Sequence, residues 1–165
     1  MALVMRNEIA DYLDVGTSET PSFALMGTGF NTLDESPSAK TTEKTYISDK
    51  ASRKTTTGYA TVFAFDTDLV SDQDAVMKLY KIGRDQLVGA DSELGYVRVE
   101  LWNRVGATGS KFKARKFKVG VEVSSISGAG GENVKVTGNL NAIGDFVDGE
   151  FDTSTKTFTE GSSEG

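Results

Sequence analysis

The sequence of 165 residues contains no cysteine and no histidine. Without cysteine the chain forms no disulfide, no thiolate metal site and no cysteine nucleophile. Without histidine it lacks the commonest general base and the commonest metal ligand. Proline is also rare, with 2 residues against 18 glycines, which is typical of a chain with many turns. These absences argue against most enzyme and metalloprotein classes.

Long apolar runs are absent as well. No segment approaches the roughly 20 apolar residues that a membrane-spanning helix needs, and residues 1–6 do not follow the layout of a signal peptide. We therefore expect a chain that is made in the cytoplasm and has no membrane contact. Its formal net charge of 18 − 24 = −6 disfavours a surface that binds nucleic acid by neutralising phosphates. The length predicts one domain over residues 1–160 and a flexible tail at 161–165.

Strand-like segments dominate what is present. Residues 96–102 alternate, which places Val97, Val99 and Leu101 on one face. Residues 111–124 predict a long strand with a bend or bulge near Arg115-Lys116, because the alternation of apolar residues is interrupted there. We expect this strand to form an antiparallel hairpin with residues 132–140. Further strands are predicted over residues 23–26, 29–33 and 58–66, and one or two more around Phe146, Phe151 and Phe158.

One helix is predicted over residues 71–82. Ser71 is a suitable N-cap, Asp74 favours the first turn, and Gly83 is a suitable terminator. The apolar positions follow helical spacing and predict a face that packs on a sheet, formed by Ala75, Val76, Leu79 and Ile82. The predicted fold class is therefore mainly β, a β-sandwich or half-barrel with one flanking helix.

A polar segment over residues 34–57 interrupts the strand pattern. Nine of its 24 residues are charged, six are threonine, and only Ala39, Tyr46, Ile47 and Ala51 are apolar. Compact domains rarely contain structureless loops longer than roughly 12–15 residues. The segment cannot bury enough apolar surface to offset the entropy of its own ordering. We therefore expect a long loop that a partner orders.

Several patterns resemble ligand sites without completing them. Asp66–Asp74 is rich in carboxylates like a calcium loop, but it lacks the glycine at the sixth position and has Met77 where the bidentate glutamate belongs. Gly27-Thr-Gly29 and Gly128–Gly131 do not fit the phosphate-binding patterns, and turns explain them. No pair of carboxylates and no nucleophile motif stands out. We expect a non-catalytic protein with no metal and no cofactor.

A basic stretch, Lys111–Lys118, contains five cations interleaved with Phe112 and Phe117. Aromatic rings between cations would permit the stacking of nucleic-acid bases. The alternative that we favour is an exposed strand face that meets an acidic neighbouring subunit, and Asp145–Asp152 supplies four carboxylates for it. A further alternative is a surface-displayed β-sandwich that binds carbohydrate or protein, with Tyr96 and Trp102 as a sugar-binding platform on one strand face.

Eight segments of the chain occur in a recognisable order. They are Ala24–Glu35, Lys44–Ile47, Asp66–Leu69, Gly89–Asp91, Tyr96–Trp102, Ala114–Phe117, Val121–Val123 and Gly138–Gly144. Their order and character resemble the major tail tube proteins of long-tailed bacteriophages and prophages of Gram-positive bacteria. The resemblance extends over residues 1–158 and depends on the order of segments, not on a catalytic signature.

The resemblance implies a subunit that assembles into hexameric rings, which stack into a hollow tube. In that family the inner strands of neighbouring subunits surround a lumen that conducts DNA without sequence-specific binding, and a long early loop reaches the adjacent ring. The partners implied are further copies of the chain, a tape measure protein, a tail-tip initiator and a tail terminator. The location implied is the virion, with assembly in the cytoplasm of the host bacterium. A tailocin or a contractile injection system, which uses the same fold, is the alternative device.

Two sets of contact residues follow. Ring-to-ring contacts are predicted for the N-terminal arm, the C-terminal tail and the polar loop, where they involve Glu35, Lys40, Glu43, Lys44, Tyr46, Ile47, Asp49, Lys50, Arg53 and Lys54. Side-to-side contacts are predicted around the strands at 58–66, 96–102, 112–124 and 132–142, with Phe63, Phe65, Arg98, Glu100, Trp102, Arg115, Lys116, Asp145, Asp148 and Glu150 as candidates. We expect the basic stretch to lie outside the lumen or to pair with carboxylates at subunit contacts.

Overall fold

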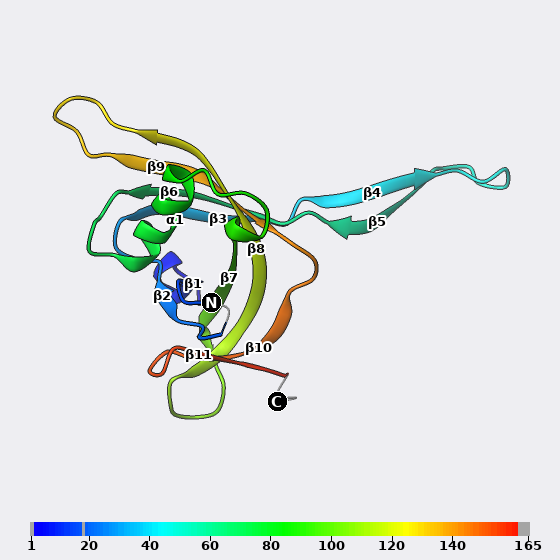
Figure 1. The fold of residues 1–165 in the computed structure, drawn as a ribbon. Coiled ribbons are helices and arrows are strands. Elements are labelled where there is room, and N and C mark those ends of the chain that lie inside the picture. The colour runs from blue at the N-terminus through cyan, green and yellow to red at the C-terminus, as the bar shows by residue number, and fades with distance from the viewer. Residues whose placement is uncertain (1, 18, 162–165) are drawn as a thin grey trace.

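The computed structural model describes residues 2–17 and 19–161, and β-strands make up most of its regular structure. A nine-stranded sheet forms the body. Seven of its strands follow the order β2-β1-β7-β8-β9-β6-β3, while β10 lies beside β8 and β11 beside β10. The sheet curls into a half-barrel with helix α1 against it (Figure 1), which confirms the predicted fold class. The strands of the body are β1 (Ile9–Asp14), β2 (Phe23–Leu25), β3 (Phe30–Ser36), β6 (Val62–Asp68), β7 (Glu93–Arg104), β8 (Lys111–Ser127), β9 (Lys135–Ala142), β10 (Val147–Asp152) and β11 (Thr157–Glu160).

The sheet is packed on both faces. Tyr96 of β7 lies in the larger core, which also receives the apolar face of α1, and Phe63 packs beside it. Val97 and Val99 of the same strand lie in a smaller core together with Phe151 of β10. Because neighbouring side chains of a strand point to opposite faces, the two cores lie on the two sides of the sheet. This arrangement confirms the faces predicted for residues 96–102.

Strand β8 passes between the two cores, and this explains the interruption in its pattern. Ala114 packs in the smaller core, whereas Phe117 packs in the larger one. The pairing of β8 with β7 runs through both residues without a shift in register. The predicted bulge near Arg115-Lys116 is therefore wrong. The alternation is interrupted because the buried face changes, and no residue is inserted there.

Most of the remaining strand predictions agree with the structure. β8 and β9 form the expected antiparallel hairpin, and β10 and β11 account for the final strands. The pattern of the sequence did not predict β1, which pairs with both β2 and β7. Two short 3-10 helices, η1 (Arg6–Glu8) and η2 (Gly89–Ser92), were also not predicted. Of the predicted tail at 161–165, residues 162–165 lie outside the described residues.

Helix α1 (Asp74–Arg84) begins and ends later than predicted. Gln73, not Ser71, occupies the N-cap position, because a turn from Val70 to Gln73 precedes the helix. Gly83 lies inside the helix, where a Cβ would come within 2.7 Å of Val123 Cγ1 on β8. The glycine therefore permits close packing on the sheet and does not end the helix. The predicted buried face is confirmed for Ala75, Val76, Leu79 and Ile82.

Within residues 2–17 and 19–161, no helix is long and apolar enough to cross a membrane.

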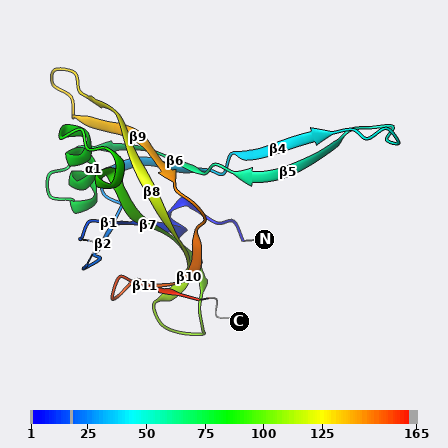
Figure 2. The same ribbon diagram turned by 45° about the vertical axis from the view of Figure 1, so that its right-hand side comes forward.

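The polar segment forms a projecting hairpin. β4 (Ala39–Lys44) and β5 (Arg53–Tyr59) pair in a separate two-stranded sheet, and we call residues 39–59 the arm. Both views show the arm extending away from the body (Figures 1 and 2). The prediction of a long loop is therefore wrong. Threonine is polar, but its β-branched side chain favours strands. In the middle of the hairpin Thr41 pairs with Thr56 and Thr42 with Thr55, and such cross-strand pairs stabilise a two-stranded ribbon.

Candidate assembly surface

The arm presents both of its faces to solvent. Every residue of β4 and every residue of β5 except Gly58 is exposed. An isolated two-stranded ribbon without a hydrophobic face is at best marginally stable in water. The arm therefore has the geometry of an element that gains stability when a partner covers it.

The tip of the arm is organised around Tyr46. The Asp49 carboxylate accepts one hydrogen bond from the Tyr46 backbone N–H at 3.0 Å and two from the Arg53 guanidinium at 3.0 and 3.2 Å. Lys44 Nζ and the Arg53 guanidinium lie 4.8 and 5.5 Å from the Tyr46 ring centroid, within reach of cation–π attraction. The hydrogen bond from Arg53 is the main cause that lowers the pKa of Asp49 below its ordinary value of 3.8. The chain itself thus supplies the contacts that shape the tip.

The arm carries an excess of positive charge. Its five cations and two carboxylates give 5 − 2 = +3, so the rest of the chain, with 13 cations and 22 carboxylates, carries −9. Ile47 at the apex is fully exposed, with a relative accessibility of 109%. Four lysines of the arm form no ion pair with any described residue: Lys40, Lys44, Lys50 and Lys54. An apolar apex among unpaired cations fits an acidic partner surface.

Glu35 fixes the root of the arm to the body. It lies on β3, four residues before the arm begins, and its carboxylate accepts two hydrogen bonds from Arg115 of β8 at 2.7 and 3.0 Å. Arg98 Nε of β7 lies 3.6 Å from the same carboxylate. The root of the arm is therefore tied to two central strands of the sheet. Glu35 was predicted as a ring contact, but in the structure its carboxylate is engaged within its own chain.

Behind this root lies a buried charge network centred on Asp11. The Asp11 side chain is 1% exposed and contacts Arg6 Nη2 at 2.8 Å and Arg98 Nη1 at 3.6 Å. The Tyr96 hydroxyl donates a hydrogen bond to Asp11. Burial, followed by the negative charge of Asp11, raises the pKa of Tyr96 well above its ordinary value of 10.0, so the hydroxyl keeps its proton. This network was not predicted, and the signal in the sequence that could identify it is an aspartate within the apolar run Ile9–Leu13.

The structure places nearly all of the predicted ring-to-ring residues on one element. Apart from Glu35, all of them lie on the arm. Lys40, Glu43 and Lys44 are on β4, Arg53 and Lys54 are on β5, and Tyr46, Ile47, Asp49 and Lys50 are in the connecting turn.

The predicted side-to-side residues do not form one surface. Phe63, Phe65 and Arg98 are only 0%, 3% and 7% exposed, so as subunit contacts they are wrong. Tyr96 is also fully buried, and it forms no sugar-binding platform with Trp102, which is half exposed. Among the other candidates Asp145 and Asp148 are exposed, and Glu100, Arg115, Lys116 and Glu150 are partly buried.

The basic stretch meets its acidic counterpart inside the same chain. β10 runs antiparallel to β8, and the register places Asp148 opposite Arg115 and Glu150 opposite Lys113. Lys118 Nζ lies 3.9 Å from Glu93 of β7. The acidic segment that was expected to meet the basic stretch of a neighbouring subunit is therefore its own adjacent strand. This cross-strand arrangement compensates charge without a partner.

The free edges of the sheet lie elsewhere than predicted. β6, β7, β8 and β9 all have strands of the same chain on both sides, whereas β2 and β3 end the main strand order. Edge strands present unpaired backbone groups that another chain can pair with. Two aromatic side chains near the root of the arm were also not predicted as contacts: Tyr59 is 65% exposed and Phe146 is 48% exposed.

The fold has a counterpart among solved structures. A chain of the six-fold symmetrised baseplate of the anti-feeding prophage superimposes with a TM-score of 0.51, over 90% of this chain and 96% of that chain. The two sequences are 6% identical, so the likeness shows a shared fold. No protein-family model matches the sequence, and no curated protein matches it.

Proposed function

We propose that the chain is a structural, non-catalytic subunit of a phage tail, and specifically a major tail tube protein. Its copies form hexameric rings that stack into a hollow tube for the passage of DNA. The observation that carries this proposal is the arm, an exposed hairpin that no other element of residues 2–17 and 19–161 covers. Such a ribbon is marginally stable in water by itself, so a partner that covers it would stabilise it.

The rest of the structure supports assembly in two further ways. The strand order ends at β2 and β3, and joining sheets side by side in a closed ring would cover such edges. The fold is shared with a chain of a six-fold symmetrised prophage baseplate, which is consistent with a ring of six copies. The tape measure protein, the tail-tip initiator and the tail terminator are the further partners of this proposal.

A second candidate is a baseplate subunit of a tailocin or another contractile device. The observation in its favour is the same structural neighbour, a chain of the anti-feeding prophage baseplate. The two candidates agree that six copies form a ring. A baseplate role predicts rings that do not stack, whereas a tube role predicts stacking without a fixed limit.

Negative-stain electron microscopy of the concentrated protein tests the proposal. We expect hollow filaments of uniform bore with a six-fold end view. Isolated rings that never stack would favour the baseplate role. A protein that sediments as a monomer at every concentration would contradict assembly and favour a surface binding module.

A further inference from the structure

We infer that the arm of one copy docks its tip into an acidic hollow on the body of a second copy. The inference rests on the proposed function and names the surface that receives the arm. The hollow has a volume of about 760 Å³ and lies between the start of β7, the end of β1 and the segments around β10 and β11. Its charged and apolar lining includes Asp14, Asp91, Leu94, Asp145, Phe158 and Glu160.

Charge is the first argument for this hollow. Five carboxylates and three lysines line it, which gives 3 − 5 = −2. Among the described residues, Asp91, Asp145 and Glu160 form no ion pair. Two of the lysines are partly engaged: Lys118 faces Glu93 at 3.9 Å, and Lys116 Nζ lies 6.0 Å from the Phe158 ring centroid. Lys78 forms no ion pair with any described residue. The hollow thus offers unpaired carboxylates to an arm that carries unpaired lysines.

Shape and polarity are the second argument. The hollow contains apolar side chains, Leu94, Val147 and Phe158, between its carboxylates. The tip of the arm presents Ile47 beyond the Tyr46 ring, with Lys44 and Lys50 close by in the chain. An apolar centre with a charged rim on each side is the usual anatomy of a specific interface. Because the arm already holds its tip in shape, docking orders few side chains.

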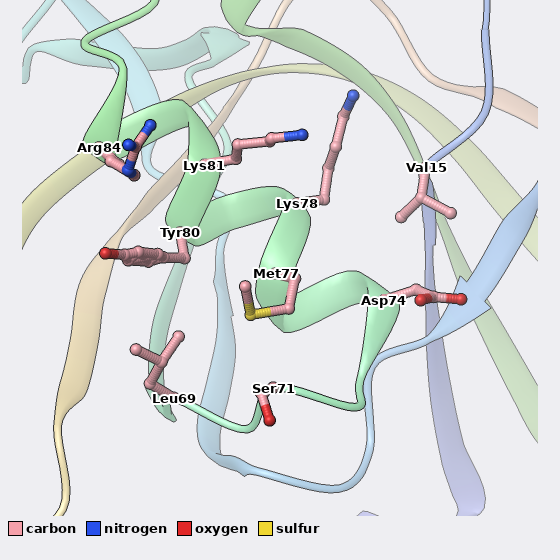
Figure 3. A pocket seen from close by; sticks show the side chains of 9 residues that line it. All are labelled: Val15, Leu69, Ser71, Asp74, Met77, Lys78, Tyr80, Lys81 and Arg84. Carbon is pink, nitrogen blue, oxygen red and sulfur yellow. The ribbon is translucent and has the colours of Figure 1, made fainter.

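The groove beside α1 is the competing surface, and its charge argues against it. It has a volume of about 740 Å³ and an apolar lining that includes Met77 and Tyr80. Figure 3 shows Lys78 and Lys81 extending from the helix, with Arg84 one turn further on. Against these three cations the groove has the single carboxylate of Asp74, so its net charge is +2, and it stays positive when the ion pair of Arg84 with Asp85 is counted. Lys78 also lines the acidic hollow. A cationic arm is repelled there and attracted to the acidic hollow.

The arm that docks into the acidic hollow belongs to another copy of the chain. The arm leaves the body from its root at β3 and β6 and points away from it in both views (Figures 1 and 2). From Ala39 to Ile47 a strand rises about 3.3 Å per residue, so the apex lies roughly 25 Å beyond the root. A ribbon of this length and direction extends toward a neighbouring molecule.

Cysteine cross-linking of the full-length chain tests the docking surface, because the natural sequence contains no cysteine that would interfere. The probe on the arm is Ile47→Cys. It is mixed in equal amounts with Ala90→Cys, which lies in the lining of the acidic hollow, or with Ser71→Cys, which lies in the lining of the groove beside α1. Both body positions are exposed and uncharged, so the pair forms a matched comparison. Mild oxidation is followed by mass spectrometry of the linked peptides.

We expect the Ile47–Ala90 link to exceed the Ile47–Ser71 link by about tenfold, the ratio that 1.4 kcal/mol of preference gives. Adding Lys50→Glu and Lys54→Glu to the arm should reduce the Ile47–Ala90 link by about the same factor, and Asp91→Lys with Glu160→Lys on the body should restore it. Equal links at both sites, or no link at Ala90, would overturn the inference.

Electron microscopy of the same samples separates this inference from the proposed function. Tubes without the Ile47–Ala90 link would overturn the docking surface and leave the tube proposal standing. The link without tubes would support the docking surface and count against the tube proposal.

Discussion

Arg115 donates two hydrogen bonds to the Glu35 carboxylate, from Nη2 to Oε1 at 2.7 Å and from Nη1 to Oε2 at 3.0 Å. The pair joins β8, the longest strand of the sheet, to the end of β3 from which the arm departs. Two parallel hydrogen bonds fix direction as well as distance. The pair therefore adds a side-chain contact to the β3–β6 backbone pairing that holds the root of the arm.

Glu35→Gln tests the role of this pair in stability. The amide retains one acceptor but loses the charge and the paired geometry, so unfolding in urea should require roughly 1–2 kcal/mol less free energy. Asp34→Asn is the matched control, because Asp34 is exposed and lies next to Glu35 on the same strand. We expect the control to change stability by less than about 0.5 kcal/mol. Equal effects of the two substitutions would contradict the anchoring role of Glu35.

Asp11→Asn tests the buried network. The substitution leaves the buried guanidinium of Arg98 with only the partly exposed Glu35, 3.6 Å from its Nε, as a counter-charge, and removing one partner of a buried pair costs about 3–5 kcal/mol. The double variant Asp11→Asn with Arg98→Met should recover part of this loss in urea unfolding, because it also removes the buried cation that has lost Asp11. A double variant less stable than Asp11→Asn alone would show that Arg98 stabilises the fold through contacts other than Asp11.

Gly83→Ala tests the close packing of α1 on β8. Alanine favours a helix over glycine by about 1 kcal/mol, but its Cβ would lie 2.7 Å from Val123 Cγ1. Overpacking costs about 1–3 kcal/mol, so we expect a net loss of stability in thermal unfolding. Gly58→Ala is the control, since nothing lies within 4 Å of its Cβ position. If Gly83→Ala raised the melting temperature, helix propensity and not packing would dominate at this position.

The pH dependence of the arm follows from Asp49. Its pKa in the folded chain is below the ordinary value of 3.8, so its contribution to the tip is complete above pH 3.8 and is lost as the pH falls through the lower, folded value. In an NMR titration the Tyr46 amide, which bonds to Asp49, should stay unchanged from neutral pH down to about pH 4 and shift below it. Arg53→Gln should move this transition upward toward pH 3.8. A transition at the same pH in both proteins would contradict the pairing.

The strands of the body can be predicted from the sequence where a regular alternation of residues marks the two faces of a strand. Val97 and Tyr96 alternate between two cores, and their alternation predicts the strand and its faces. The faces of β8 could not be predicted in this way. Ala114 and Phe117 face different cores, so a single alternation of apolar residues does not describe both. The same reasoning does not predict β1, because Asp11 interrupts an apolar strand. Its burial depends on contacts with Arg6 and with the distant residues Tyr96 and Arg98.

The arm shows a different limit of sequence reasoning. Its lack of apolar residues identifies a segment that its own body does not cover, and that part of the prediction agrees with the exposure of β4 and β5. The same composition does not predict the hairpin. The threonine pairs and the turn at Tyr46–Asp49 depend on the register between β4 and β5, which composition does not give. Glu35 and Arg98 were assigned to subunit contacts because sequence does not reveal that two charged residues distant in the chain bind each other.

We propose that the arm joins copies of this chain, and a variant without the arm tests this directly. Residues 40–58 are exchanged for Asn-Gly, which connects Ala39 to its partner Tyr59 through a two-residue hairpin turn. The body should keep its circular dichroism spectrum and its cooperative unfolding, because both cores lie outside the arm. We predict that negative-stain electron microscopy shows hollow filaments for the intact chain and none for this variant at the same concentration. Filaments of equal length from both proteins would contradict the account.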